Sequence, residues 1–112
     1  MPNYNLQLNT IFQALSDPTR REVLRKLSAG PAAMTELAKP FQMALPSFSQ
    51  HLDVLESSGL VTSKKIGRVR TYQMETNAVR VAENWLAEQR SLWEQRLDQL
   101  DNFLLKQKES KK

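Results

Sequence analysis

The apolar positions at the start of the chain recur at helical spacing. Within residues 5–16 they fall every three or four positions, as on one face of an α-helix. They are Leu8, Ile11, Phe12 and Leu15. We therefore predict a first amphipathic helix over residues 5–16, with its apolar face directed toward a core or a partner chain.

A second helix is predicted directly after the first. Asp17 is a residue type that caps helix N-termini, and Pro18 suits the first helical position because its missing N–H is not needed there. Gly30 followed by Pro31 is a common way for a helix to end. The side chains that we expect to face inward are Val23, Leu24 and Leu27.

Two further short helices are predicted within residues 34–58. Thr35 can cap the first, and Pro40 limits it. Pro46 starts the second, which Gly59 ends. The second helix has apolar side chains at positions i, i+4 and i+7, namely Phe48, Leu52 and Leu55. Two such helices joined by a short connector are typical of a helix-turn-helix.

The apolar period changes from helical to alternating after Gly59. The runs 61–66 and 69–74 are rich in β-branched and aromatic residues, and Gly67-Arg68 lies between them. This pattern predicts a β-hairpin within residues 61–75, which we call the wing.

Residues 77–106 have the pattern of one long helix, which Asn77 can cap. About thirty residues at 1.5 Å each make a rod of roughly 45 Å, longer than so small a domain can cover. Apolar residues recur along it at heptad-like spacing, which is typical of a seam between helices. They are Leu86, Trp93, Leu97, Leu100 and Leu104.

These elements together predict one domain over residues 1–112. Its fold class is mainly α with a small β-hairpin: a winged helix-turn-helix with a long C-terminal dimerisation helix. The seam predicts that the last helix pairs with that of a second copy of the chain.

Composition adds a charge argument to this pattern. The 112 residues include 16 Lys and Arg against 12 Asp and Glu, a formal net charge of +4. The sequence pI of about 9.6 suits a nucleic-acid partner.

The chain has no cysteine, so disulfides and thiolate metal sites are excluded. No signal peptide or membrane-spanning run is visible, and we expect a cytoplasmic protein without a membrane partner.

The second helix of the pair is the candidate DNA reader, because an α-helix fits the major groove. The polar residues that it offers are Ser47, Ser49, Gln50, His51 and Asp53. A Gln side chain can bond adenine in a bidentate way, Ser suits phosphates or base edges, and Asp can accept from cytosine. For His51, packing between helices competes with a phosphate contact. A polar face on its own is equally typical of a solvated helix.

The predicted wing carries four basic residues within seven positions, with no acidic residue among them. They are Lys64, Lys65, Arg68 and Arg70. A protruding basic turn suits the phosphate backbone or the adjacent minor groove. Thr35, at a helix start, is a further candidate phosphate contact. A basic hairpin alone is often only solvated charge, but its position directly after the reader helix favours DNA binding.

Three stretches resemble the ArsR-type winged helix-turn-helix repressors. They are ALSDPTRR at 14–21, LPSFSQHL with LESSGLV within 45–61, and GRVRTY at 67–72. The resemblance covers about residues 6–105. It implies a homodimeric repressor of transcription, with an interface built from the first and last helices. The candidate interface residues are then the five seam residues of the last helix with Leu8, Ile11 and Phe12. Such a dimer is expected to bind double-stranded DNA at an inverted-repeat operator.

Many members of that family sense metals through a Cys-x-Cys-type motif before the reader, or through His and carboxylate ligands on the last helix. This chain has no cysteine, and its single histidine, His51, lies in the predicted reader. Glu94, Asp98 and Asp101 share a helix face but have no imidazole beside them. We therefore expect the metal-independent subgroup, with no metal site and no cofactor.

No catalytic constellation is visible, because the only imidazole lies in the reader helix and no phosphate-binding loop is present. We therefore expect that the protein is not an enzyme.

Two alternative functions stay open beside that of a DNA-binding repressor. One is a protein-interaction module that uses the long last helix. The other is a repressor that senses a small molecule in a pocket near the dimer interface, lined by Trp85 and Trp93. The sequence names no inducer.

Overall fold

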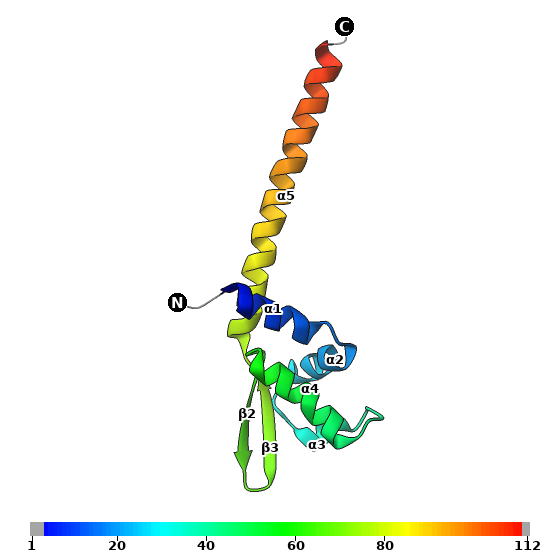
Figure 1. Ribbon diagram of the computed structural model, residues 1–112, viewed down its shortest axis with the longest axis vertical. Helices are drawn as coiled ribbons and strands as arrows, with labels where there is room; N and C mark the ends of the chain where they lie inside the picture. The colour runs from blue at the N-terminus through cyan, green and yellow to red at the C-terminus, as the bar shows by residue number, and fades with distance from the viewer. Residues whose placement is uncertain (1–3, 111–112) are drawn as a thin grey trace. The chain divides into compact units, whose positions relative to one another are not determined.

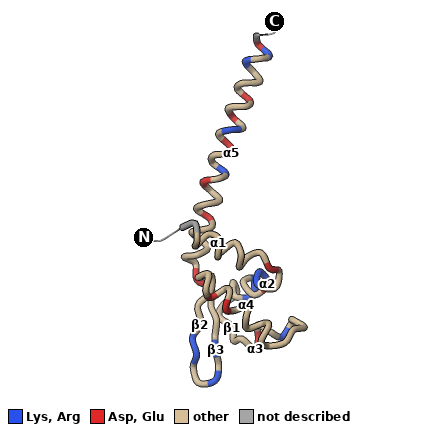
Figure 2. The backbone as a smooth tube through the Cα atoms, in the orientation of Figure 1, with Lys and Arg blue, Asp and Glu red and all other residues tan. Residues whose placement is uncertain are grey.

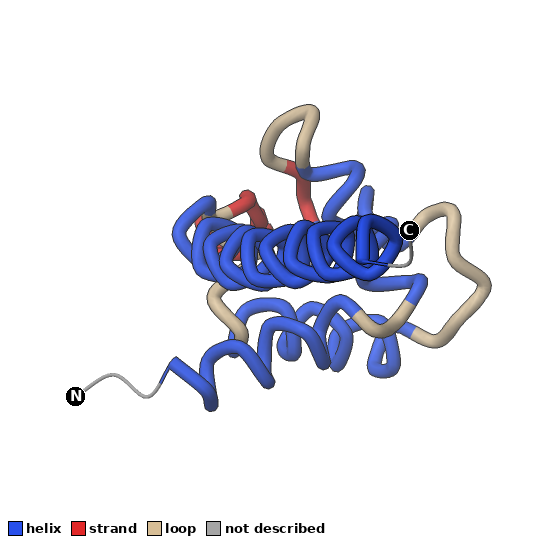
Figure 3. Tube along the Cα trace, turned by 90° about the horizontal axis from the view of Figure 1, so that it is seen from above, coloured by secondary structure: helices blue, strands red, loops and turns tan. Residues whose placement is uncertain are grey.

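The computed structural model describes residues 4–110, and it divides between Ala82 and Glu83 into two compact units. Most of the described chain is helical, and the strands are short (Figures 1 and 3). The elements are α1 (Tyr4–Leu15), α2 (Pro18–Leu27), β1 (Ala32–Ala33), α3 (Met34–Ala38), α4 (Leu45–Ser57), β2 (Val61–Ile66), β3 (Val69–Met74) and α5 (Thr76–Ser110).

The start of α2 confirms the predicted cap. Asp17 has an extended backbone, and its Oδ2 accepts the backbone N–H of Arg20 at 3.1 Å. Pro18 occupies the first turn, where no intrahelical partner for its nitrogen is needed. The local sequence alone therefore sets where α2 begins.

The end of α4 also follows from one residue. Gly59 has a φ of +82°, a left-handed conformation that costs glycine little. The N–H of Gly59 donates to the carbonyl of Glu56, and that of Leu60 to the carbonyl of Leu55, both at 3.1 Å. This is a Schellman-type cap, which satisfies the last carbonyls of α4 and directs the chain into β2.

Two predicted caps are wrong. Helix α3 begins after Ala33, so Thr35 lies inside it. Helix α5 begins at Thr76, so Asn77 lies in its first turn, where its N–H faces Oε1 of Glu75 at 3.4 Å. Both helices follow a strand with almost no connecting residues. Strand pairing therefore fixes their starts. Helix α3 has no side-chain cap, and the Glu75 carboxylate accepts one N–H of the first turn of α5.

The sheet has one strand more than predicted. Its order is β1-β3-β2 and both pairs are antiparallel. The predicted hairpin is confirmed, with Ile66 opposite Val69 across a two-residue turn. Gly67, at the first central position with φ +64°, fits a type II′ turn. Strand β1 is two alanines, which carry no strand pattern, so only its pairing with Tyr72 and Thr71 makes it a strand.

The core of the first unit lies between the short helices, the sheet and the first turns of α5. The inward side chains predicted for α2 and α4 are all buried there. The buried apolar residues are Ile11, Ala14, Val23, Leu24, Leu27, Leu37, Phe48, Leu52, Leu55, Leu60, Val61, Tyr72, Ala78 and Ala82. Each fully buried Leu or Phe stabilises the fold by about 1.5–3 kcal/mol, so this core holds α4 firmly in place.

The second unit is the remainder of α5, from Glu83 onward. Its large apolar side chains are exposed to solvent in the single chain. They are Trp85, Leu86, Leu92, Trp93, Leu97, Leu100, Phe103, Leu104 and Leu105. Within residues 4–110, no helix is both long enough and apolar enough to cross a membrane.

Candidate nucleic-acid interface

Helix α4 is fixed by the side of it that faces the core. Phe48, Leu52 and Leu55 are fully buried. The connector from α3 is held on the same side, because the ring of Phe41 packs 5.4 Å from that of Phe48. The ammonium of Lys26 in α2 lies 5.8 Å above the Phe41 ring. These contacts leave the opposite face of α4 directed to solvent.

The structure separates the five predicted reader residues into three locations. Ser47, Gln50 and Asp53 are exposed and belong to the outward face. Ser49 is half-buried and, with Asp53, lines a hollow between α4 and the wing. His51 is half-buried on the other flank, toward α1 and α2. One continuous polar face therefore carries three of the five residues.

Val54 is a candidate reader that the sequence argument missed. It lies one helical turn after Gln50, and 36% of its surface is exposed. An exposed aliphatic side chain on a reader face can contact the methyl group of thymine. Its i+4 spacing from Gln50 was the available signal, but an apolar residue is normally assigned to the core.

The wing presents its basic residues to solvent. Lys64, Lys65, Arg68 and Arg70 are all exposed. Figure 2 shows basic positions gathered on the part of the hairpin farthest from the helices. Lys65 stands directly opposite Arg70 in the strand register. Like charges at such positions repel, so an anion between them, such as a phosphate, would relieve the repulsion.

A hydrogen-bonded chain ties the wing to the end of α4. The hydroxyl of Ser63 donates to the carboxylate of Glu56 at 2.8 Å, and Nη1 of Arg70 donates to the Ser63 hydroxyl at 2.9 Å. Arg70, predicted as a phosphate contact, therefore also has a partner inside the protein. Burial raises the pKa of the neighbouring Tyr72 hydroxyl above its ordinary value, and the Glu56 carboxylate raises it further.

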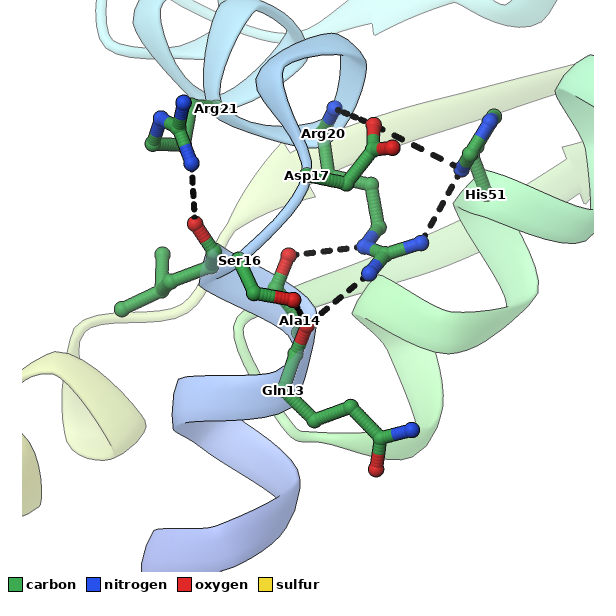
Figure 4. A network of polar contacts seen from close by, with 8 residues as sticks. Gln13, Ala14, Ser16, Asp17, Arg20, Arg21 and His51 are labelled. Atoms are coloured by element: carbon green, nitrogen blue, oxygen red, sulfur yellow. Dashed lines mark hydrogen bonds and ion pairs between the residues drawn. The ribbon is translucent and has the colours of Figure 1, made fainter.

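Arg20 dominates the junction of α1, α2 and α4 (Figure 4). Its Nε donates to the carbonyl of Ala14 at 2.7 Å and its Nη2 to the carbonyl of Gln13 at 2.8 Å. Its Nη1 lies 3.0 Å from Nδ1 of His51. Neither Arg20 nor this network was anticipated from the sequence. The ALSDPTRR and SQHL stretches both contain its members, but their spacing alone does not bring them together.

Asp17 adds a carboxylate to the same junction. Its Oδ2 lies 3.9 Å from Nδ1 of His51. Burial by itself would raise the pKa of Asp17, but the backbone hydrogen bonds from Arg20 and Thr19 and the positive charge of Arg20 outweigh it. The pKa of Asp17 consequently lies below its ordinary value. The carboxylate is thus held in its charged form, where it caps α2.

The predicted dimer residues occupy two environments. The five seam residues of α5 are exposed. In α1, Leu8 and Phe12 are half-buried, and Ile11 is fully buried in the core of the first unit. The Ile11 side chain therefore packs inside its own chain. Thr35, the remaining predicted phosphate contact, is exposed on α3.

Acidic residues on α5 do not gather into a ligand set. Oε1 of Glu94 lies 3.9 Å from Nε of Arg90. Across the part of the chain that the structure describes, no group of three or more His, Cys, Asp or Glu side chains is placed to hold a metal ion.

Comparison with known proteins gives a consistent set of relatives. The family described as "Helix-turn-helix domain" matches residues 15–64. The transcriptional repressor SdpR of Bacillus subtilis is 32% identical over 79 residues, which is 70% of this chain and 88% of that protein. An arsenical resistance operon repressor of Staphylococcus xylosus is 40% identical over 68 residues, 61% of this chain and 65% of its own length.

Solved structures agree with these relatives. A crystal structure of an ArsR family transcriptional regulator is 58% identical, with a TM-score of 0.80, and the match covers 84% of this chain and 97% of that one. A homodimeric winged helix-turn-helix DNA-binding domain from Mycobacterium bovis is 27% identical, with a TM-score of 0.59. That match covers 77% of this chain and 82% of the other.

Proposed function

Since the chain belongs to the ArsR family of transcriptional regulators, we propose that it is a homodimeric repressor that reads an inverted-repeat operator with α4. The wing holds the adjacent DNA backbone. One observation carries this proposal: the exposed polar face of α4 stands beside a hairpin whose basic residues have no acidic residue among them. Relatives of this kind regulate transcription and are not enzymes.

Direct reading is assigned to the outward face of α4. Gln50 can bond an adenine, Ser47 a base edge or phosphate, and Val54 a thymine methyl. Asp53 can accept from cytosine or orient Arg68, which lines the same hollow. Lys64, Lys65 and Thr35 supply sequence-independent phosphate contacts.

Dimerisation is proposed through α5. An exposed apolar face as long as the one after Glu83 is costly in water and is covered when two copies associate. The homodimeric state of the Mycobacterium bovis neighbour supports the same arrangement. In a two-fold dimer the two reader helices meet successive major grooves about 34 Å apart, which requires an operator of two inverted half-sites.

Because the regulator must reach the chromosome, we place it in the cytoplasm.

Metal-independent regulation is part of the proposal. It is supported by the cysteine-free sequence and by the position of the single histidine at the α1–α2–α4 junction.

A small-molecule site beside Trp93 is the alternative to a protein interface on α5. The hollow that Trp93 lines there has a volume of about 160 Å³. Pockets for small organic ligands are usually at least about 300 Å³, so this feature favours a protein interface over a ligand site.

The decisive experiment selects bound DNA from a random pool and tests the recovered motif for two-fold symmetry. Affinity for that motif is then measured against salt. We expect Arg68→Ala to weaken binding to all sequences. The slope of log affinity against log salt concentration should become shallower by about one unit, the effect of one lost phosphate contact. Arg90→Ala removes the same charge from α5 and should leave the slope unchanged. Recovery of no motif, or binding that does not change with salt, would overturn the proposal.

A further inference from the structure

Arg20 connects two carbonyls at the end of α1 to the reader helix. Gln13 and Ala14 lie in the last turn of α1, where carbonyls lack an intrahelical partner. Nε of Arg20 donates to the Ala14 carbonyl. Nη2 of Arg20 donates to the Gln13 carbonyl, which also accepts from the N–H and the hydroxyl of Ser16. The third nitrogen is thereby aimed at His51 of α4, and a planar guanidinium fixes all three directions at once.

We propose that Arg20 is a positioning residue for DNA reading, which acts through His51 to set the rotation of α4. This role presupposes the DNA binding proposed above. His51 directly follows Gln50 in α4, so any shift of the His51 ring relative to Arg20 also shifts the outward face. Only 23% of the His51 side chain is exposed, which suits an anchor better than a base contact. Arg20 thus controls specificity without touching DNA.

The protonation state of His51 decides whether the anchor exists. An arginine has only donors, so Nδ1 of His51 must accept the bond from Arg20 and the ring must be neutral. A proton on Nδ1 would replace this bond by two facing donors, both positively charged.

The groups that face His51 across the junction are Arg20 and Asp17. Asp17 would favour the protonated ring, but its Oδ2 is 3.9 Å away, beyond hydrogen-bond length, and already caps α2. The members of α4 one turn away are Ser47, Phe48, Val54 and Leu55, none of which is charged. Acidification is therefore expected to release the anchor.

The chain offers a matched control for Arg20. Nη1 of the neighbouring Arg21 donates to the carbonyl of Leu15 at 2.7 Å, which also closes the end of α1. Among the described residues, Arg21 makes no hydrogen bond or ion pair with α4. A role in stability alone would make Arg20→Gln and Arg21→Gln similar in their effect on DNA reading, whereas positioning affects only the first.

The test measures the ratio of affinities for the selected operator and for unrelated DNA, with the full chain, at pH 7.0 and pH 5.5. The ratio cancels the general gain of positive charge. His51 is the single histidine and the chain has no cysteine, so the comparison of the parent with His51→Asn isolates the His51 ring. His51→Asn keeps an acceptor near the Nδ1 position but has no proton to gain. Thermal unfolding of each variant at both pH values checks that it is folded.

We expect Arg20→Gln to lower the ratio about tenfold at pH 7.0, the effect of one lost charge-assisted hydrogen bond. Arg21→Gln should leave it within about twofold. The parent ratio should fall on acidification and that of His51→Asn should not. Equal pH profiles for the parent and His51→Asn, or an unchanged ratio in folded Arg20→Gln, would overturn the positioning role. If the parent itself prefers no DNA sequence, the proposed function fails instead.

Discussion

Gln50 is the residue whose replacement most clearly separates base reading from backbone contact. It is exposed at the centre of the outward face of α4. We expect Gln50→Ala to cost about 1–3 kcal/mol on the preferred operator, because a bidentate bond to one base is lost. Affinity for unrelated DNA should hardly change. Binding to operators with each base pair substituted in turn is the measurement.

The control for this variant is Gln95→Ala, the same chemical change on α5. It should leave all DNA affinities as they are. A uniform loss across every operator in Gln50→Ala would assign Gln50 to the phosphate backbone instead.

Asp17 links stability to pH. Its pKa is lowered in the folded chain, so its contribution to stability is fully present above the ordinary carboxyl pKa and is lost as pH falls through the lowered value. Asp17→Ala should lower the free energy of unfolding by about 0.5–2 kcal/mol at pH 7, the usual cost of losing an N-cap. Urea unfolding at pH 7, 4 and 3, at one fixed protein concentration, measures this.

Asp17→Asn is the matched variant, because asparagine caps helices equally well but does not titrate in this range. The parent should lose stability relative to Asp17→Asn as the pH falls from 4 to 3. A constant difference between the two proteins across this interval would show that the Asp17 charge contributes nothing.

At the scale of elements, the wing depends on its attachment to α4. Ser63→Ala removes the hydroxyl that joins Glu56 to Arg70. The hairpin keeps its backbone pairing, so we expect little loss of stability. The wing should become less well oriented, and operator affinity should fall about threefold to tenfold, the effect of one or two modest hydrogen bonds. Electrophoretic or fluorescence binding measurements suffice.

Thr62→Ala is the control, since it removes a hydroxyl from the adjacent, exposed position of β2. It should bind as the parent does. An affinity loss shared by both variants would mean that β2 contributes through strand propensity, and that the Glu56–Ser63–Arg70 chain does not orient the wing.

Elements with their own sequence pattern were predictable, and elements defined by long-range pairing were not. Local residue types determine three of these features: the Asp17 cap, the Gly59 cap and the hairpin turn at Gly67. Strand β1 exists only because β3 lies beside it, and the starts of α3 and α5 depend on the same sheet.

The candidate site shows the same division. The outward positions of α4 follow from helical periodicity, so Gln50 and Asp53 were found. Periodicity does not decide between a packing and a phosphate role for His51, because the location of His51 depends on Arg20, 31 positions away in the sequence. A contact across that distance has no periodic signal in one sequence.

At the scale of the whole molecule, the feature that most needs a partner is the apolar face of α5, because its large side chains are exposed to water in the single chain. Trp93 and Leu97 are 61% and 56% exposed, and both belong to the predicted heptad-like seam. We expect Leu97→Glu to place a charge in the centre of the proposed dimer interface and to separate the copies at micromolar concentration. Sedimentation analysis measures the mass, and operator binding measures the consequence.

The matched control is Gln95→Glu, which adds the same charge to the opposite side of α5, away from the seam. It should remain dimeric with parental affinity. Leu97→Glu should still contact a half-site but lose most operator affinity, because the second reader helix is no longer held in register with the first. Since the first unit has its own core, that unit should stay folded in Leu97→Glu, as a cooperative thermal unfolding transition would show. A Leu97→Glu chain that stays dimeric would place the interface elsewhere, and dissociation of both variants alike would reduce the effect to net charge.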